Sequence, residues 1–528
     1  MGFYLAQAED ALYKVSASDG AVTTLTLYPG VTLDTTRRPR GAVLGRMIAW
    51  VHSPNRSLWI DEANHVWPLA LSAPTSAPSL AAGGGSGLTG AYRAKVTFLV
   101  KDDFGNVLLE SDFSPLSSTS AALANSDLTY SNLPVSPDSI VNARRIYRTA
   151  SGPGTTYFIA FDVEDNVTTT ISDGTSDESI ALNVAPTDLG PAPSNRIELI
   201  CVWKDRLWAK IPEYPDYVYF SALRKPYAWP ATHSYECGPV GADLYGVTGF
   251  IPRRDELGVC RRNVLWKIIG DGPSNFSRIK VVEGVGCMAP DSIVIIRDVG
   301  YWLGEDGVYT WGPEGVLCIS RDTVHPWFTT DAHFNRATFS QAVAFWNPRD
   351  DTYNLLLSAA GSTTLNRWVS YDTRRKIWLG PHLTSVSTPT AAALLEDADD
   401  LFLPCLGFAD GHIRKLNQSG FSDDGAAIAF DVITKFHSGE NPDLTHYWGE
   451  LSVLTKVESA GTLTITPTVG RLDATAGAAI THTLTTGRER LRRLGVGALC
   501  SLRFQQSTNA QGVTIYGYEI PFHELGRR

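Results

Sequence analysis

Two short acidic runs are the first places where this sequence could carry chemistry. The run "NPRDDTY" contains Asp350 and Asp351, and the run "LLEDADDLF" contains four carboxylates, which are Glu396, Asp397, Asp399 and Asp400. A glycosidase needs two carboxylates on either side of a sugar, and a calcium loop needs several oxygen ligands within a short span. Neither run follows the Asp-x-Asp-x-Asp-Gly order of a calcium loop. We therefore interpret both runs as acidic surface turns.

Other motifs that could support catalysis are weak or missing. Asp423-Asp424-Gly425 resembles the Asp-box of sialidase propellers, but it does not recur and lacks the downstream aromatic residue. The eleven histidines are dispersed without a His-Glu-x-x-His pattern, and His325 is interpreted as a turn residue. The stretch "GGGSG" at residues 83–87 is interpreted as a linker, because it does not fit a G-x-S-x-G nucleophile elbow. We expect no catalytic residue, no metal site and no cofactor.

Clusters of arginine are the remaining candidates for binding. They lie in or beside expected turns and comprise Arg37, Arg38, Arg40, Arg253, Arg254, Arg261, Arg262, Arg374, Arg375, Arg488, Arg490, Arg492 and Arg493. Solvated turn charges, ion pairs between subunits, and contacts with DNA or a partner ring all remain open for them. The last cluster, "GRERLRRLG", fits a helical turn or a basic strand at a subunit contact equally well.

The totals of the sequence limit the class of protein. The net charge of -10 argues against a surface built to hold nucleic acid by its phosphates. The seven cysteines are scattered without a C-x-x-C pair, which predicts neither a zinc site nor a disulfide framework but buried thiols in a reducing cytosol. The sequence shows no signal segment and no apolar run of membrane-spanning length. We expect a soluble protein, made in the cytoplasm, with two to four domains in its 528 residues.

A stretch rich in turns shows which elements must position these residues. In "DVGYWLGEDGVYTWGPEGV", residues 298–316, Asp306-Gly307 supplies a two-residue hairpin turn between two aromatic strands. Gly312-Pro313-Glu314-Gly315 forms a second turn, and the β-branched residues 292–296 form a strand upstream. Four short antiparallel strands in about thirty residues have the size of one propeller blade.

Similar units recur along the chain, each with a turn of Asp, Gly or Asn between apolar strands. They include "GFYLAQAEDALYKVSASDGAVTTLTL", "GRMIAWVHSPNRSLWIDEANHVWPLAL", "ELICVWKDRLWAKIPEYPDYVYFSAL", "DELGVCRRNVLWKIIGDG", "DTYNLLLSAAGSTTLNRWVSYDTRRKIWLG" and "DLFLPCLGFADGHIRKLN". Together they predict an all-β protein that contains a β-propeller of roughly seven blades.

Two segments depart from this rhythm. Residues 73–194 begin with a Pro/Ser/Gly-rich stretch and continue with two hairpins, which predicts an inserted Ig/fibronectin-like β-sandwich. Residues 420–528 predict a C-terminal β-sandwich. The expected order is therefore first propeller blades in 1–72, the inserted sandwich in 73–194, the remaining blades in 195–419 and the terminal sandwich in 420–528.

Several stretches resemble a known family. "KDRLWAKIPEYPDYVYFSALRKPYAWP", "RRDELGVCRRNVLWKIIGDGP", "EGVGCMAPDSIVIIRDVGYWLGEDGVYTW" and the ending "GYEIPFHELGRR" are similar to the tail nozzle (tail tubular protein B) family of short-tailed bacteriophages. The resemblance covers residues 197–311 best, the C-terminus less well, and the insertion only in kind.

The resemblance implies a structural role in a virion tail. A nozzle protomer would join five others in a hexameric ring below the portal adaptor protein, around the channel for DNA ejection. Its partners would be further copies, the adaptor, tail fibres or other tail proteins, and genomic DNA that passes without specific binding. An acidic wall would let DNA slide without sticking. Assembly would take place in the host cytoplasm.

Two other classes remain open. A glycan-binding or glycan-cleaving β-propeller could stack sugars on aromatic residues such as Trp302, Trp311, Trp368 and Trp378, although such residues commonly fill blade cores. A hub or baseplate protein of a long-tailed phage would share the same β-modules.

Overall fold

A computed structural model shows an all-β protein with only short helices. It describes the chain except residues 1–2, 17–18, 28–30, 46, 52–55, 61–63, 153, 194–195, 239–244, 384–386, 397–401, 417–419, 421, 440–442, 459–460, 472–473 and 527–528. The chain forms two compact units. Unit 1 comprises Met1–His382 and Pro389–Arg414, and unit 2 comprises Leu383–Thr388 and Lys415–Arg528.

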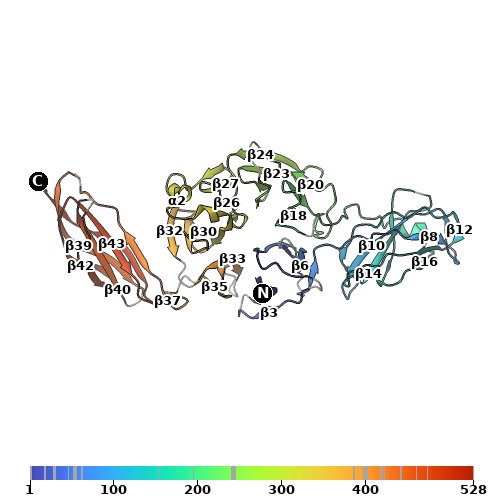
Figure 1. The fold of residues 1–528 in the computed structure, drawn as a ribbon, viewed down its shortest axis with the longest axis horizontal. Helices are drawn as coiled ribbons and strands as arrows, with labels where there is room; N and C mark the ends of the chain where they lie inside the picture. The colour runs from blue at the N-terminus through green and yellow to red at the C-terminus, as the bar shows by residue number, and fades with distance from the viewer. Residues whose placement is uncertain are drawn as a thin grey trace. The chain divides into compact units, whose positions relative to one another are not determined.

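Most of unit 1 consists of small antiparallel sheets that follow one another in chain order (Figure 1). The first two sheets are β1(Phe3–Ala8), β2(Ala11–Ser16), β3(Val22–Thr24) and then β4(Arg40–Leu44), β5(Met47–Val51), β6(Leu58–Ile60), β7(Val66–Pro68). The third and fourth are β17(Leu199–Trp203), β18(Arg206–Lys210), β19(Tyr217–Phe220), β20(Ser234–Glu236) and β21(Gly249–Pro252), β22(Glu256–Cys260), β23(Val264–Ile269), β24(Ser277–Glu283).

Three more sheets follow in this series. They are β25(Val294–Ile296), β26(Val299–Leu303), β27(Val308–Gly312), β28(Gly315–Cys318), then β29(Val343–Asn347), β30(Thr352–Leu357), β31(Arg367–Asp372), β32(Ile377–Leu383), and finally β33(Pro389–Glu396), β34(Phe402–Phe408), β35(Ile413–Lys415). The short helices η1(Pro290–Ser292), α2(His325–Thr329) and η2(Arg336–Gln341) connect them. The strand expected at residues 292–296 therefore begins one turn later, after η1.

The first strands of successive sheets contact each other. β4 lies against β17, β17 against β21, β21 against β25, β25 against β29, and β29 against β33. β1 contacts β33, and Tyr4 of β1 packs on buried Leu395 and Cys405 of the last sheet. These contacts arrange the sheets around a common centre, as Figure 1 shows. Unit 1 thus belongs to the propeller-like class of all-β architectures.

Apolar side chains fill the spaces between neighbouring sheets. Trp302, Tyr309 and Trp311 form one core with Ile251 of the preceding sheet, and all six residues of β30 are buried. β26 and β27 form a hairpin as the sequence predicts, but its turn differs from the expected one. Leu303 pairs with Val308, so the loop is the four residues Gly304–Gly307, and neither Asp306 nor Gly307 has a positive φ. Aromatic residues therefore serve packing here, where each buries a large apolar area.

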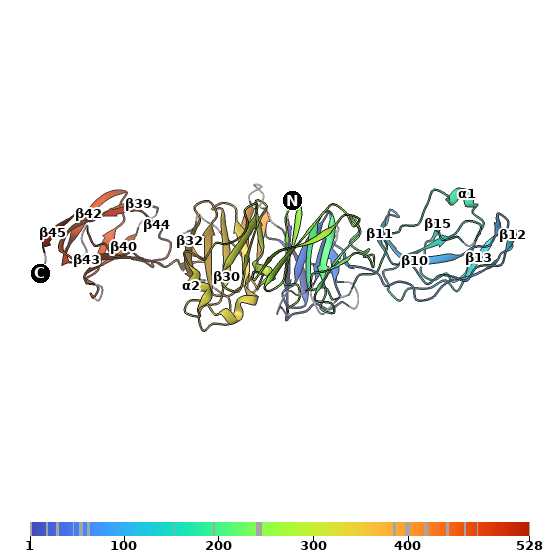
Figure 2. The same cartoon turned by 90° about the horizontal axis from the view of Figure 1, so that it is seen from above.

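A segment between the second and third sheets forms its own strands. They are β8(Ser79–Ala82), β9(Leu88–Gly90), β10(Ala94–Lys101), β11(Val107–Glu110), β12(Leu123–Ser126), β13(Leu128–Ser131), β14(Ala143–Arg148), β15(Phe158–Val163) and β16(Ile171–Asp173). They pair as β11-β10-β14-β15, β16-β13-β8 and β12-β9. The short helix α1(Asp177–Ile180), visible in Figure 2, follows β16, and Ser176 caps its N-terminus.

The glycine-rich stretch at residues 83–87 is not a linker, contrary to the sequence interpretation. It joins β8 to β9, and the Gly83 N–H donates to the Asp127 carbonyl at 2.7 Å. A Cβ at Gly85 would lie 2.0 Å from an Asp127 carboxylate oxygen. The glycines are therefore required for close packing around Asp127.

A ladder of serines continues the sheet beyond β11. Backbone N–H groups of Phe98, Val96, Ala94 and Tyr92 donate to the hydroxyls of Ser111, Ser114, Ser117 and Ser120, at 2.9 to 3.0 Å. The same four serines donate their own N–H groups to the carbonyls of those four residues. The serines recur every third residue, whereas the residues they bind along β10 recur every second residue. The N–H group of each of these four partners therefore has an acceptor.

Unit 2 consists of two larger antiparallel sheets and a small hairpin, β36(Ser422–Asp423) with β37(Ala426–Ala427). One sheet contains β38(Phe430–Ile433), β43(Leu499–Gln506), β40(Thr462–Gly470) and β41(Ile480–Thr483). The other contains β42(Gly487–Gly497), β39(Thr445–Val457), β44(Val513–Glu519) and β45(Phe522–Gly526). Residues of both sheets, including Leu451, Val453, Leu463, Ile465 and Leu502, share one buried core.

The run "GRERLRRLG" lies in β42 and is a strand. The helical alternative is wrong, because residues 487–497 pair along the full length of β39. In the described part of the chain, no helix has both the length and the apolar character needed to cross a membrane.

Candidate functional site

Three of the predicted arginines converge at the centre of unit 1. Arg40 donates from Nε to Asp291 Oδ1 at 2.9 Å and from Nη2 to Oδ2 at 3.1 Å. Arg38 donates from Nη1 to Asp291 Oδ2 at 2.7 Å. The Asp291 side chain is 16% exposed and both guanidinium groups are 27% exposed, so the cluster is largely shielded from solvent.

A second carboxylate joins the cluster from a neighbouring sheet. Arg40 also donates to the Glu198 carbonyl at 3.0 Å, and Arg37 lies 3.7 Å from a Glu198 carboxylate oxygen. Lys210 forms an ion pair with Glu198. Burial opposes ionisation of Asp34, but hydrogen bonds from Thr36 and the Arg37 charge outweigh it and lower the pKa of Asp34. Positive and negative groups in the cluster therefore compensate one another.

These residues span the centre between non-adjacent sheets. Arg40 begins β4, Glu198 precedes β17, and Asp291 lies in η1 just before β25. In the order of contacts, the sheets that begin with β17 and β21 lie between those that begin with β4 and β25. The Arg38 and Arg40 pairs with Asp291 therefore cross the centre at the end where the first strands begin. We call Arg38, Arg40 and Asp291 the central clamp.

A second set of charges lies at the other end of the first strands, in the turns that follow them. Lys204-Asp205 and Arg297-Asp298 are two-residue hairpin turns in which both residues have positive φ, which Asp tolerates better than most residues. Arg254 donates its backbone N–H to Asp298 Oδ1 at 2.8 Å, so the turn of one sheet binds the turn of the next.

Two further ion pairs continue this series. The Lys204 ammonium lies 3.6 Å from an Asp255 oxygen, and the Arg297 guanidinium lies 2.9 Å from Asp351 Oδ2. Arg374 donates to the same Asp351 oxygen at 2.7 Å. Turns of four consecutive sheets are thus linked by charge, and we call this series the turn belt. Arg253, Arg254 and Arg374 belong to it.

The other predicted arginines do not join either group. Arg261 is buried, pairs with Asp216 and donates to the Cys237 carbonyl at 3.1 Å, and Arg262 lies over the Tyr245 ring at 4.3 Å. Arg375 lies 3.7 Å from Asp372. In unit 2, Arg488 pairs with Glu519, Arg492 donates to the Ala478 carbonyl, and Arg490 and Arg493 are exposed on β42. The thirteen arginines therefore form several local groups rather than one site.

The acidic runs do not form a pair of facing carboxylates. Asp351 is buried under Arg297 and Arg374, and Asp350 accepts from the Asn347 side chain at 3.1 Å. Glu396 ends β33 and is exposed, whereas Asp397, Asp399 and Asp400 lie outside the described residues. No group of three His, Cys, Asp or Glu side chains in the described ranges is arranged to hold a metal.

Two of the aromatic residues considered for sugar stacking are core residues. Trp302 and Trp311 are buried, and Trp378 packs at the edge of the core around Tyr371. His325 begins α2 rather than a turn. Trp302 and Trp311 therefore offer no exposed ring face on which a sugar could stack.

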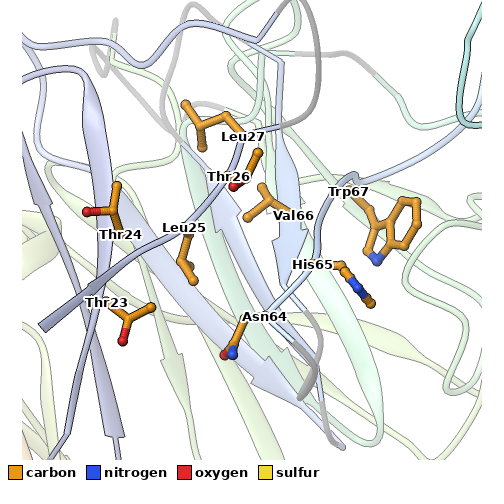
Figure 3. A pocket seen from close by; sticks show the side chains of 9 residues that line it. All are labelled: Thr23, Thr24, Leu25, Thr26, Leu27, Asn64, His65, Val66 and Trp67. Atoms are coloured by element: carbon orange, nitrogen blue, oxygen red, sulfur yellow. The ribbon is translucent and has the colours of Figure 1, made fainter. Parts of the chain in front are cut away.

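A shallow cavity of about 360 Å³ lies between the outer strands of the first two sheets. Its lining, shown in Figure 3, consists of Thr23, Thr24, Leu25, Thr26 and Leu27 on one side and Asn64, His65, Val66 and Trp67 on the other. The Trp67 ring stacks on Trp59 with 6.3 Å between ring centroids and contacts His65 edge-on with 5.5 Å between centroids. Trp67 therefore already packs against two other rings. The described residues that line the cavity include no Asp, Glu, Lys or Arg.

Sequence reasoning found the arginines of the central clamp but not their partner. Asp291 is 251 residues from Arg40, and a single carboxylate before a β-branched run carries no local signal. The turn belt does have a signal in the sequence, because a basic residue followed by Asp recurs at hairpin turns in "KDR" and "RDV".

Comparisons with known proteins give only distant structural similarity. No protein-family model matches the chain, and no curated protein does. Among solved structures, PorZ, a surface component of the type-IX secretion system of Porphyromonas gingivalis, shows 10% identity and a TM-score of 0.27, covering 99% of this chain and 80% of its own. The dihydro-heme d1 dehydrogenase NirN shows 11% identity and a TM-score of 0.25, covering 77% and 75%. At these TM-scores the similarity supports no inference about function.

Proposed function

We propose that this chain is a structural component of a bacteriophage tail, one protomer of a hexameric nozzle ring around the DNA-ejection channel below the portal adaptor. The resemblance of residues 197–311 to nozzle proteins motivates the proposal. Its partners are further copies of the chain, the portal adaptor, tail fibres or other tail proteins, and genomic DNA in transit. Its location is the virion tail.

The order of the modules supports this role. We propose that the seven sheets of unit 1 are the blades of one propeller, that residues 79–185 are an inserted Ig/fibronectin-like sandwich, and that unit 2 is a C-terminal sandwich. In the described ranges the first and last of these sheets contain three strands each, and β1 contacts β33. Propellers with insertions and appended sandwiches provide several distinct surfaces, which a heterologous ring requires.

The central clamp is the observation that carries the proposal furthest. Arg38 and Arg40 reach Asp291 across the centre of unit 1 and occupy it with ion pairs. Because these ion pairs cross the centre where the first strands begin, a duplex would have to pass between copies rather than through one. That is the arrangement of a ring whose protomers surround a shared channel.

Electron microscopy of the purified full chain tests the proposal. Negative-stain images with two-dimensional averaging, recorded over a range of concentrations with and without the candidate adaptor protein, should show six-fold rings with an open centre. Particles that remain single under all these conditions would contradict it. Cleavage or specific binding of host-surface glycans by such single particles would instead support the glycan-active alternative.

A further inference from the structure

The acidic excess of the chain is confined to unit 1. Unit 2 contains eleven Lys or Arg and eleven Asp or Glu residues, so the whole net charge of -10 belongs to unit 1. Within unit 1, residues 79–185 contain twelve acidic and six basic residues. Two of these six, Arg144 and Arg148, are fully buried and already paired with Asp165 and Asp173. The surface of this segment is therefore strongly acidic.

The β10–β11 turn presents an exposed aromatic ring within this acidic surface. Phe104 is 91% exposed, and Asp103 and Glu164 lie near it in exposed positions. The turn is rigid, because Asp102 Oδ1 accepts from the N–H groups of Phe104 and Asn106 at 2.9 and 2.8 Å. Lys101 ties the turn to the next hairpin by pairing with Glu164 at 2.7 Å. A single exposed ring is common on protein surfaces, but here it stands beside an exposed carboxylate on an acidic surface, a combination that fits an apolar and basic partner surface.

Unit 2 offers a face of opposite character. Leu451 and Val453 of β39 point into the core, so Ser452 and Leu454 point to the outer face of the sheet. Their cross-strand partners Arg490 and Arg488 share that face, as does Glu519 of β44. Beyond a register shift, Arg493 lies opposite Glu450.

Charge and apolar area are combined on this outer face. Arg488 is compensated by Glu519, whereas Arg490 and Arg493 form no ion pair within the described residues. Glu489 points inward, 3.1 Å from His482 Nδ1, and so does not neutralise the strand's outer side. Leu454 is 41% exposed and Tyr516 of β44 is 64% exposed. β42 is also the edge strand of its sheet, with its outer backbone side open.

We propose that the β10–β11 turn of one copy binds the outer face of β42-β39-β44 in a second copy. Phe104 packs against Leu454 and Tyr516, and Asp103 faces Arg490 and Arg493. The two surfaces differ, so the contact is heterologous and repeats around a ring. The inference rests on the proposed function, since it names the faces by which protomers of that ring meet.

Charge reversal in the full chain tests the contact. Phe104→Ser and the double variant Arg490→Glu/Arg493→Glu should each raise the dissociation constant for self-association at least tenfold, as measured by sedimentation velocity at low salt. All of these side chains are exposed, so folding should be preserved. The matched control Lys435→Glu/Arg471→Glu makes the same change of charge at two exposed positions of unit 2 away from β42 and should assemble like the wild type.

A charge swap makes the test specific. Adding Asp103→Lys to the Arg490→Glu/Arg493→Glu variant should restore part of the lost assembly. Assembly that is unaffected by any of these substitutions would overturn the inference and leave the ring proposal standing. A wild-type chain that stays monomeric both with and without the candidate adaptor protein would overturn both. Loss of duplex DNA binding in the arginine variant, with assembly unchanged, would identify nucleic acid as the ligand of this face and also overturn the inference.

Discussion

Arg40 forms a two-bond ion pair with Asp291 across the centre of unit 1, although 251 residues separate them. Asp291 accepts a third bond from Arg38, so one carboxylate binds two guanidinium groups. The pair links a sheet near the start of the chain to one that is not its neighbour. The ion pair therefore stabilises the arrangement of the sheets relative to one another rather than a single sheet.

Loss of the central carboxylate should destabilise unit 1. We expect Asp291→Asn to lower the free energy of unfolding by about 2 kcal/mol, because two largely shielded guanidinium groups lose their anionic partner. The measurement is the urea midpoint of the tryptophan fluorescence transition. Asp255→Asn is the control, since its carboxylate is 79% exposed and lies 3.6 Å from Lys204, and it should change stability by less than about 0.5 kcal/mol. Equal effects of the two variants would argue against a special role of the clamp.

The buried carboxylate of the turn belt should make stability depend on pH. Burial works against ionisation of Asp351, but Arg374 and Arg297 outweigh it and lower its pKa. A carboxylate with a lowered folded-state pKa stabilises the protein above its unfolded pKa of about 4, and this contribution is lost as the pH falls through the folded value. The free energy difference between wild type and Asp351→Asn should therefore be largest near neutral pH and shrink in acid.

Denaturant unfolding at a series of pH values from neutral to acidic measures this difference. Asn suits the site because Asp351 has a φ of 56°, a conformation that Asn also adopts. Asp372→Asn provides a comparison in the same sheet. The Asp372 carboxylate accepts from the backbone N–H groups of Arg374 and Arg375, and the amide oxygen of Asn can still accept both bonds. A constant difference across the whole pH range would contradict the role assigned to Asp351.

Local patterns in the sequence predicted the strands well. The hairpin around residues 103–106 follows from turn chemistry, because Gly105 adopts the positive φ that the turn needs and Asp102 accepts from backbone N–H groups within it. The hairpin between β26 and β27 also forms where the sequence predicts one, but without positive φ at Asp306 or Gly307. The buried run of β30 follows from its apolar character, whereas the basic run of β42 left helix and strand equally open until its pairing with β39 was seen. These features depend on neighbours a few residues apart, and a sequence displays them directly.

Features that depend on distant partners were not predictable. Nothing near Asp291 indicates that Arg38 and Arg40 will meet it, and nothing near Gly85 indicates that Asp127 will fill the space a side chain would need. The serines at 111, 114, 117 and 120 do show a spacing of three, but that period fits neither a strand nor a helix. Its meaning emerges only from pairing with β10, where three residues match two.

The serine ladder should be sensitive to loss of single hydroxyls. Ser114→Ala leaves the buried N–H of Val96 without its 3.0 Å acceptor, and Ser117→Ala does the same to Ala94. Each change should cost about 1–2 kcal/mol, the penalty for an unsatisfied buried donor. Ser118→Ala is a close control, because Ser118 is exposed and only its main-chain carbonyl accepts from the ladder. Amide hydrogen exchange at residues 92–98 should speed up in the first two variants and stay unchanged in the control.

The buried thiols should react slowly in the native protein. Burial raises the pKa of Cys237, Cys287 and Cys500 to about 12 in each case, and only the thiolate attacks an alkylating reagent. At pH 8 about one such thiol in ten thousand is ionised, since four pH units separate the two values. Native protein treated with iodoacetamide should therefore stay unmodified at these three positions by peptide mass spectrometry, while urea-unfolded protein is labelled at all of them. Rapid labelling of Cys287 in the native protein would show that the sheets around η1 open. Cys287 lies just before the clamp residue Asp291. If the central clamp keeps these sheets closed, Asp291→Asn should raise the rate at which Cys287 is labelled.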